Sequence, residues 1–533
     1  MSTTPTPTPA QASELPAEVE LLVVGAGLSG IGAAYRIQQA NPGIDYLVLE
    51  GREASGGTWD LFRYPGVRSD SDMYTLSFPF RPWTSKQAIA DGDEILEYIR
   101  VTAREAGIDR RIRYGCTVLG AEWSSPDQRW TVTVRRSDAS TATIRTGYIH
   151  LGSGYYDYES PHDAGFLGTE DFAGQILHPQ FWPEDLDLAG KRVVVIGSGA
   201  TAVSLVPAIA KEAASTTMLQ RTPSYVFQVP AEDVIVQGLR KALPAKAVHR
   251  IARAKNVGTQ SFFYGLSRRR PAAAKAIVMG DLKRHLPEDV IGQHFTPPYD
   301  VWDQRLCAVR GGDLFEVIQE GKAQVVTGHI DRFVPEGVRL TDGRVVEADI
   351  VVTATGLRLK ALGGIDFRVD GAEVPLAETF AYRGLMLGGV PNVSMTVGYT
   401  NASWTLRADL VSRYVARLIR HMRDHGYGIA LPVAPEGMGA RPILDLTAGY
   451  VQRAIGAFPK AGDRAPWTMP QSYVKDKIAF RRAEVTQDMH FVPKGATGVT
   501  LPKGAPAPAS LDLPGSSSNT DDSLGDTVVE VHA

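Results

Sequence analysis

The chain of 533 residues is long enough for about three or four domains, and 44% hydrophobic and 22% charged residues are typical of a globular enzyme. A formal net charge of −3 argues against a nucleic-acid partner. The sequence contains no run of about 18 apolar residues, so no membrane-spanning helix is predicted. Cys116 and Cys307 are the only cysteines, which excludes a disulfide framework and predicts a reducing, cytoplasmic location.

The chain begins with a Thr- and Pro-rich segment, residues 1–18, which lacks the basic and apolar parts of a signal peptide and is predicted to be a disordered lead. The stretch "VELLVVGAGLSGIGAAYRIQQ" then predicts a buried strand, a glycine turn and a small-residue helix. "DYLVLEGR" predicts the next buried strand, which completes a βαβ unit. Residues 19–157 are therefore predicted to be the first part of a dinucleotide-binding domain.

The first glycine turn has the pattern Gly25-x-Gly27-x-x-Gly30, between a strand and a helix. Its glycines allow backbone amides to approach a pyrophosphate at the helix N-terminus. Glu50 ends the next strand, where a carboxylate receives two ribose hydroxyls. The sequence therefore predicts a dinucleotide site of the FAD type.

A second βαβ unit begins at "KRVVVIGSGATAVSLVPAIAKEAASTTMLQR", residues 191–221, with the pattern Gly197-x-Gly199-x-x-Ala202. Its second strand ends in Gln220-Arg221 and not in an acid. A carboxylate there would repel a 2′-phosphate, whereas a guanidinium binds one in a bidentate manner. The second site is predicted to prefer NADPH, with a solvated surface arginine at position 221 as the alternative.

The rest of the chain completes an α/β protein with two Rossmann-like dinucleotide-binding domains, for FAD and NADP, and a mainly helical insert. We predict an NADP-binding domain at 158–346, containing the insert at about 228–300, and the second part of the FAD-binding domain at 347–501. A strand, a polar turn and a long amphipathic helix are expected within "VPNVSMTVGYTNASWTLRADLVSRYVARLIRHM". The Pro-, Ser- and Gly-rich tail, residues 502–533, is predicted to be disordered.

A flavin-type site and an NADP-type site in one chain predict hydride transfer between two cofactors. A disulfide reductase would need a close pair of cysteines, which this chain lacks. A monooxygenase needs no protein nucleophile, because reduced flavin itself activates oxygen. A flavoprotein that passes electrons from NADPH to a partner protein remains an alternative.

Two longer sequence patterns help to choose between these classes of flavoprotein. The stretch "FAGQILHPQFWP", residues 172–183, fits Phe-x-Gly-x-x-x-His-x-x-x-Trp-Pro. The stretch "GGTWDLFRYPGVRSDSD", residues 56–72, fits Gly-x-Trp-x-x-x-x-Tyr-Pro-Gly-x-x-x-Asp. Both resemble fingerprints of the Baeyer–Villiger monooxygenases, which are class B flavin-dependent monooxygenases. Over about residues 20–500 the chain is similar to the subgroup of the mycobacterial ethionamide-activating monooxygenase.

The resemblance implies roles for individual residues. Arg305, in "VWDQRLC", would be the catalytic arginine, and Asp70 would position it; from the residues alone, Asp70 and Asp72 could equally be N-caps. Many relatives carry a lysine that contacts the 2′-phosphate where this chain has Gln304, so selectivity would depend more on Arg221 and Thr222. Further cofactor-binding residues implied by the resemblance are Thr58, Trp59, Asp70 and Tyr74. His178 is assigned to the NADP-domain contacts, and no metal site is expected.

The resemblance also implies a reaction. NADPH would reduce FAD, oxygen would form a C4a-peroxyflavin, and this species would convert a ketone into an ester or lactone and also oxidise sulfides. A flavin monooxygenase acting only on nitrogen or sulfur is the nearest alternative. The expected partners are a small ketone or sulfide and O2, with no nucleic acid, in a monomer or weak homo-oligomer.

Overall fold

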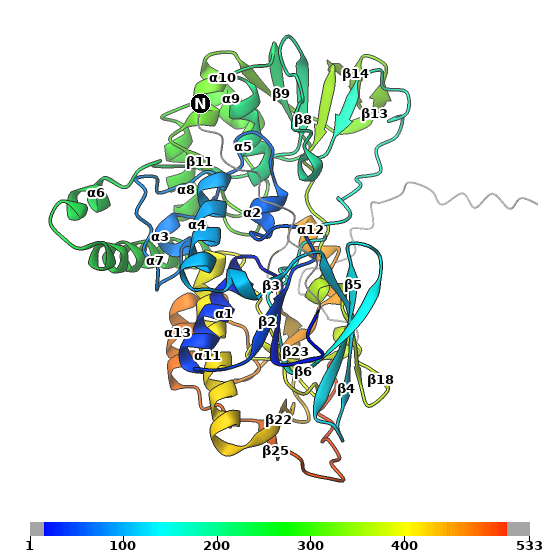
Figure 1. The fold of residues 1–533 in the computed structure, drawn as a ribbon. Helices are drawn as coiled ribbons and strands as arrows, with labels where there is room; N and C mark the ends of the chain where they lie inside the picture. The colour runs from blue at the N-terminus through cyan, green and yellow to red at the C-terminus, as the bar shows by residue number, and fades with distance from the viewer. Residues whose placement is uncertain (1–14, 445, 447, 509–533) are drawn as a thin grey trace, which may run out of the picture.

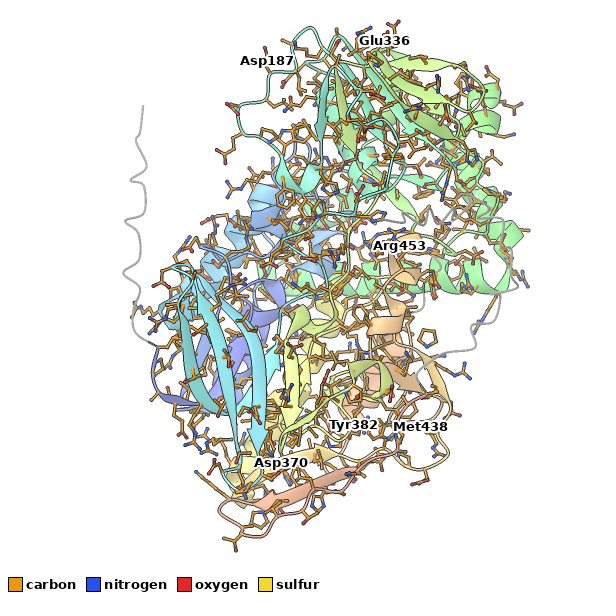
Figure 2. All side chains as sticks on the ribbon, turned by 90° about the vertical axis from the view of Figure 1, so that its right-hand side faces the viewer. Asp187, Glu336, Asp370, Tyr382, Met438 and Arg453 are labelled. Atoms are coloured by element: carbon orange, nitrogen blue, oxygen red, sulfur yellow. The ribbon has the colours of Figure 1, made fainter. Side chains whose placement is uncertain are left out.

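A computed structural model describes residues 15–444, 446 and 448–508 of the chain. The protein has two lobes, each built around its own β-sheet (Figure 1). In Figure 2, Asp187 and Glu336 mark the far end of one lobe, Asp370 marks the opposite end of the other, and Arg453 lies between them. The predicted α/β class with Rossmann-like units is confirmed.

The first lobe contains an eleven-stranded mixed sheet, in which β1 pairs in parallel with both β2 and β6. Its main path has the order β18-β17-β4-β5-β6-β1-β2-β3, and β21, β20 and β19 join it beside β6. The strands are β1 (Glu18–Val24), β2 (Tyr46–Leu49), β3 (Ile112–Arg113), β4 (Cys116–Ser124), β5 (Arg129–Arg136), β6 (Thr141–Leu151), β17 (Asp366–Val369), β18 (Ala372–Glu373), β19 (Ala381–Tyr382), β20 (Met386–Leu387) and β21 (Val393–Met395).

Helices cover one face of this sheet. The small-residue helix α1 (Leu28–Ala40) packs along α11 (Trp404–His425), which follows the polar turn predicted from the sequence. Both helices contribute buried aliphatic side chains to the same core cluster. The lobe also contains the helices α2 (Thr58–Leu61), α3 (Met73–Leu76), α4 (Gly92–Glu105), α12 (Gly449–Gln452) and α13 (Tyr473–Arg482). Two small antiparallel sheets pair β22 (Tyr427–Pro432) with β25 (Met489–Pro493) and β23 (Ala440–Pro442) with β24 (Lys460–Gly462).

The second lobe contains a five-stranded parallel sheet of order β12-β9-β8-β16-β7. Its strands are β7 (Gln175–Leu177), β8 (Arg192–Ile196), β9 (Ser215–Gln220), β12 (Ala323–Thr327) and β16 (Ile350–Thr353), and its helices include α5 (Ala200–Ile209) and α10 (Asp313–Gln319). A small antiparallel sheet, β13 (Ile330–Val334), β14 (Gly337–Leu340) and β15 (Val345–Glu347), lies beside it.

The position of β16 corrects the predicted domain boundary at residue 347. This strand pairs with β8 and β7 in the second sheet, although the sequence analysis assigned residues 347–501 to the first domain. A parallel strand buried on both faces has the same apolar sequence in either sheet, so the sequence could not decide between them. The chain therefore returns to the first lobe only after β16.

The predicted insert is helical. It contains α6 (Val234–Arg240), α7 (Ala245–Arg269), α8 (Pro271–Leu282) and α9 (Glu288–His294), and the parallel strands β10 (Val226–Val229) and β11 (Cys307–Arg310) flank it. Helices α6 and α7 project to the side of the molecule in Figure 1, and α7 packs against α3 of the first lobe. No helix among the described residues is both long enough and apolar enough to cross a membrane.

Residues near both ends of the chain are more ordered than the sequence predicted. The Ala17 carbonyl accepts a hydrogen bond from the Arg145 amide at 2.9 Å, although residues 1–18 were expected to be disordered. Ala505 and Ala507 donate backbone hydrogen bonds to Ala434 and Glu378, at 3.0 and 2.7 Å, so residues 502–508 dock on the first lobe. These contacts use backbone groups and small side chains, which composition does not reveal. The rest of both predicted disordered segments lies outside the described residues.

Candidate functional site

A cavity of about 1390 Å³, here called the central cavity, lies between the lobes and reaches both glycine turns. Its volume exceeds the range of about 300–1,000 Å³ that is usual for one small-molecule site. The predicted site residues in its wall are Gly25, Gly27, Glu50, Thr58, Trp59, Asp70, Gly197, Gly199, Arg221, Thr222, Gln304 and Arg305. The fold thus brings most of the predicted site into one space.

The shape of the first glycine turn depends on one positive φ angle and two close approaches. Gly25 has a φ of +97°, and a Cβ at Gly30 would lie 1.8 Å from the Gly25 carbonyl oxygen. A Cβ at Gly25 would lie 2.7 Å from the carbonyl oxygen of Gly152, directly after β6. Gly30 is therefore a packing residue behind the turn, whereas Gly25 and Gly27 line the cavity.

Glu50 is held at the N-terminal end of α1. Its carboxylate accepts hydrogen bonds from the Ala26 amide at 2.7 Å and from the Arg52 amide at 3.0 Å. Burial raises the pKa of the Glu50 carboxyl, and the two backbone hydrogen bonds act in the opposite direction. The carboxylate is thus fixed between the turn and the cavity, where sequence reasoning placed a ribose acceptor.

The second glycine turn opens towards the cavity. Gly197 has a φ of +140°, and its Cβ would lie 2.3 Å from the Ala354 carbonyl oxygen, next to β16. No atom lies within 4 Å of an added Cβ at Gly199, which precedes α5. Ala202 is fully buried in the core of the second lobe, so its contribution is close packing of α5 and not ligand contact.

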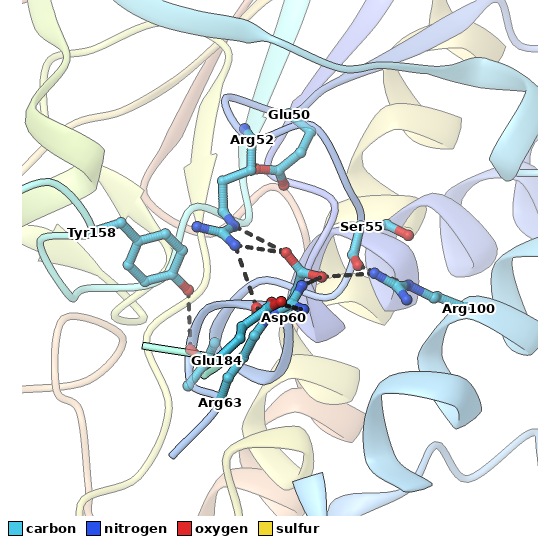
Figure 3. Close-up of polar contacts among 9 residues, drawn as sticks. Glu50, Arg52, Ser55, Asp60, Arg63, Arg100, Tyr158 and Glu184 are labelled. Atoms are coloured by element: carbon cyan, nitrogen blue, oxygen red, sulfur yellow. Dashed lines mark hydrogen bonds and ion pairs between the residues drawn. The ribbon is translucent and has the colours of Figure 1, made fainter. Parts of the chain in front are cut away.

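Different residues of the loop 56–72 make separate contacts. Asp60 is buried and accepts from Arg52 and Arg100 at 2.7 Å each, and Arg63 lies 3.4 Å away (Figure 3). This arrangement fixes the first half of the loop against α4 and places Arg52 in the wall of the central cavity. One buried carboxylate facing three arginines leaves a net positive charge beside Glu50.

The second half of the loop joins the two lobes. A Cβ at Gly66 would lie 2.5 Å from the carbonyl oxygen of Ser204 in α5, so only glycine permits this approach. The Tyr64 hydroxyl lies 3.4 Å from the Ser204 hydroxyl, and Arg68 forms an ion pair with Asp313 of α10. The Tyr-Pro-Gly part of the fingerprint is therefore an interlobe contact.

Asp70 and Arg305 meet at the wall of the cavity. Their side chains form a salt bridge with 2.6 Å between Arg305 Nη2 and Asp70 Oδ2, across 235 residues of sequence, from 70 to 305. The Asp70 carboxylate raises the pKa of the Arg305 guanidinium above its ordinary value. The Arg305 side chain remains 34% exposed, and it lines the cavity, so a fixed cation faces the cavity space.

The two aspartates of this loop have different roles. Asp72 is the N-cap of α3, where it accepts from the Thr75 amide at 3.0 Å, and it also accepts from Asn256 and Gln260 of α7 at 2.7 and 2.8 Å. Asp70 makes the salt bridge instead. The N-cap interpretation thus applies to Asp72 and is wrong for Asp70.

Tyr74 does not belong to the site. The sequence analysis assigned it to cofactor binding, but its side chain is fully buried in the core of the first lobe and is absent from the cavity wall. Burial raises the pKa of Tyr74 to about 12. All four residues of α3 are buried, so Tyr74 contributes to the packing of this helix in the core.

Sequence reasoning missed an aromatic group beside Arg305. Tyr155, Tyr156 and Tyr158 follow the carboxyl end of β6, and all three line the cavity together with Tyr450. Burial raises the pKa of Tyr450 to about 12, although the positive charge of Arg305 acts against this shift. The signal in the sequence was a Gly-Ser-Gly turn and three tyrosines directly after a buried strand.

Trp404 completes this aromatic wall. Its ring stacks on Tyr155 with 4.9 Å between centroids, and its indole nitrogen donates to the Ser29 hydroxyl at 2.8 Å. Trp59 also lines the cavity, whereas Trp83 and Trp182 do not. His178, from the fingerprint at residues 172–183, is likewise absent from the cavity wall, and burial lowers its pKa.

Comparison with known families gives two matches. Residues 71–287 match the model described as flavin-binding monooxygenase-like, and residues 23–86 match an NAD(P)-binding Rossmann-like domain. Among curated proteins, the FAD-containing monooxygenase EthA of Mycobacterium tuberculosis is 47% identical over 473 residues, which cover 88% of this chain and 96% of the relative. The probable FAD-binding monooxygenase AlmA of Acinetobacter baylyi is 40% identical over 486 residues, covering 90% and 97%.

Solved structures share the fold at lower identity. An oxidised steroid monooxygenase bound to NADP has a TM-score of 0.69 and 22% identity, covering 89% of this chain and 100% of its own. An open cyclohexanone monooxygenase has a TM-score of 0.65 and 22% identity, covering 78% and 90%. The overall fold is thus shared with both proteins.

Proposed function

The chain belongs to the FAD-containing monooxygenases, and from this premise we propose that it uses NADPH and O2 to convert ketones into esters or lactones. FAD supplies the redox centre that activates O2, and NADPH supplies the hydride. For each turnover, one ketone, O2, NADPH and a proton give one ester, water and NADP⁺. One oxygen atom enters the product between the carbonyl carbon and a neighbouring carbon.

The residues of the first lobe fit FAD. Gly25 and Gly27 leave the backbone at the N-terminal end of α1 open to the cavity, which is the arrangement that receives a pyrophosphate. Glu50 would accept hydrogen bonds from ribose hydroxyls, and Trp59 would contact the ring system. Arg52 adds a positive charge to the same wall.

The residues of the second lobe fit NADPH. Gly197 and Gly199 expose the N-terminal end of α5, and Arg221 stands at the end of β9, where a 2′-phosphate is distinguished from a hydroxyl. Thr222 and Gln304 line the same cavity. The Thr222 carbonyl accepts a hydrogen bond from Ser198 at 3.1 Å, which orders the turn around this position.

The salt bridge between Arg305 and Asp70 is the observation that carries the ketone assignment. Insertion of oxygen next to a carbonyl builds negative charge on oxygen atoms, and a fixed guanidinium in a cavity with little water stabilises that charge. Asp70 orients the guanidinium. Tyr156 and Tyr450 line the cavity wall together with Arg305.

Product analysis under ¹⁸O2 tests this proposal. The FAD-loaded protein would be incubated with NADPH and a panel of linear, cyclic and aryl ketones, together with one sulfide. The masses of the products would then be measured by mass spectrometry. We expect esters or lactones carrying one ¹⁸O atom. Sulfoxide without any ester would support the enzyme that oxygenates only nitrogen or sulfur. NADPH oxidation that requires an added acceptor protein would instead support an electron-transfer flavoprotein.

A further inference from the structure

Arg453 stands in the wall of the central cavity together with Arg221, although the two come from different lobes. Arg221 directly follows β9 of the second sheet, and Arg453 directly follows α12, close to the junction of the lobes (Figure 2). Both side chains are exposed towards the cavity space. Because Arg221 and Arg453 are more than 200 residues apart in the sequence, the sequence did not predict that they line one cavity.

The acidic residues of the cavity wall are engaged elsewhere. Glu50 accepts from two backbone amides, and Asp70 pairs with Arg305. The other acidic residues of the wall are paired as follows: Asp157 with Arg358, Glu159 with Arg135 and Lys360, and Asp331 with Arg339. No carboxylate of the wall is thus left for a further cation.

Arg221 and Arg453 differ from the other basic side chains of the wall. Arg52 pairs with Asp60, Arg68 with Asp313, Arg305 with Asp70 and Lys360 with Glu159. Within residues 15–444, 446 and 448–508, neither Arg221 nor Arg453 has a salt-bridge partner. Among the described residues, these two charged groups therefore have no carboxylate partner, and they face a space large enough for dinucleotides.

The two guanidinium groups also act on each other. Burial lowers the pKa of Arg453, and the positive charge of Arg221 lowers it further, so the groups lie within range of direct repulsion. Like charges that face the same cavity raise the free energy of the ligand-free protein. An anion with about two negative charges, placed between them, would remove this cost and accept hydrogen bonds from both.

We propose that Arg453 is the second cation of the 2′-phosphate site and that it binds this phosphate together with Arg221. The inference rests on the proposed use of NADPH. It also accounts for the neutral side chain at Gln304, which lines the same cavity but cannot supply a charge. The phosphate would then bridge β9 of the second lobe and α12 of the first lobe, so selectivity for NADPH is shared between lobes.

Calorimetric titration of the full-length, FAD-loaded protein with adenosine 2′,5′-bisphosphate tests this role without turnover. Adenosine 5′-monophosphate, which lacks the 2′-phosphate, is titrated in parallel. Arg453→Gln should weaken binding of the bisphosphate about 10- to 100-fold, as expected for a lost hydrogen bond to a charged group, and change the monophosphate affinity little. Arg453→Lys, which keeps the charge, should retain part of the difference.

Arg420→Gln is the matched control, because Arg420 is an exposed arginine of α11 that pairs with Asp424 outside the cavity wall. It should leave both affinities unchanged. If Arg453→Gln binds the bisphosphate within about twofold of the wild type, with unchanged flavin content and melting temperature, Arg453 has no role in the site. If the wild type itself does not prefer the bisphosphate, both this inference and the proposed use of NADPH are wrong.

Discussion

At the scale of single residues, the loop 56–72 shows how a short stretch serves several purposes. Asp60 forms salt bridges with arginines, and Gly66 permits contact with α5. Asp70 orients Arg305, and Asp72 caps α3. Each of these contacts requires one particular side chain, because charge, size and reach differ at every position. A fingerprint in this loop therefore records several independent constraints and not a single binding motif.

Replacement of Arg305 should separate NADPH consumption from oxygen insertion. In Arg305→Ala we expect ester formation to fall about 10²- to 10³-fold, since one fixed electrostatic partner of the developing charge is lost. NADPH oxidation needs only the approach of the two cofactors and should continue, with hydrogen peroxide as the product. The ratio of ester to NADPH consumed, measured with a peroxide assay, reports the effect.

Asp70→Asn provides the graded comparison, because it keeps the size of the side chain but removes the charge opposite Arg305. It should lower the same ratio less than Arg305→Ala does, since the guanidinium is still present. Near wild-type ester formation in Arg305→Ala would mean that another group stabilises the developing charge. The assignment of Arg305 would then be wrong.

At the scale of secondary-structure elements, the attachment of the helical insert depends on Asp72. This carboxylate caps α3 and accepts from Asn256 and Gln260 of α7, so one side chain joins the first lobe to the insert. Arg253 of α7 is buried and donates to the carbonyl groups of Tyr74, Thr75 and Ser77. The α7 helix is thus held at both ends of α3.

Asp72→Ala should destabilise the protein by about 1–3 kcal/mol, because an N-cap and two interhelical hydrogen bonds are lost together. Urea unfolding measures this difference. Asn256→Ala, which removes only one hydrogen bond, should cost less. Asp45→Ala is the control, since Asp45 is exposed and its ion pair with Arg111 is long, at 3.7 Å. Equal stability of Asp72→Ala and the wild type would show that packing alone attaches α7.

The pairing of β6 with β21 contains a buried histidine that makes stability depend on pH. His150 is fully buried, its Nδ1 lies 2.9 Å from the Ser394 hydroxyl, and burial lowers its pKa to about 4. The unfolded chain binds the proton below about pH 6.5. This contribution to stability is therefore complete above about pH 6.5 and is lost as the pH falls towards 4, for a total of about 3 kcal/mol.

His150→Gln should reduce the loss of stability between about pH 7 and pH 4.5, because the glutamine side chain does not titrate in this range. Urea unfolding of both proteins at the two pH values gives the comparison. The variant should be less stable than the wild type at pH 7, since the site is fully packed. An unchanged pH dependence would mean that the pKa of His150 is the same in the folded and unfolded protein, which contradicts the lowered value.

At the scale of the whole molecule, the C-terminal region joins parts of the protein that are distant in sequence. α12 places Tyr450 beside Arg305 and Arg453 in the cavity wall with Arg221. Further along, residues 502–508 return to the first lobe through hydrogen bonds from Ala505 and Ala507. Composition alone therefore does not indicate that residues 502–508 dock on the first lobe.

Two truncations test where the fold ends. A chain that stops after Pro508 should keep the wild-type melting temperature, because the removed segment is rich in Ser and Asp and its composition predicts disorder. A chain that stops after Leu501 should melt several degrees lower, since two backbone hydrogen bonds and the buried Ala507 are lost. Equal melting temperatures for the two chains would show that residues 502–508 contribute nothing to stability.

The sequence alone determined the two βαβ units, the glycine turns and the acid or arginine that follows each of them. These features are local: Gly25, Glu50, Gly197 and Arg221 lie within one supersecondary unit each, and their spacing is fixed by the chain geometry of that unit. The family resemblance added Asp70 and Arg305, whose side chains form a salt bridge of 2.6 Å in the structure. The helical character of the insert also followed from its composition.

The tertiary structure decided what depends on distant parts of the chain. It placed β16 in the second sheet, buried Tyr74 in the core, and brought Tyr450 and Arg453 to the cavity. A buried strand has the same sequence in either sheet, and the exposed face of a helix is chosen by whatever packs against it. These positions depend on contacts between residues far apart in sequence, so neither local propensity nor motif spacing could specify them.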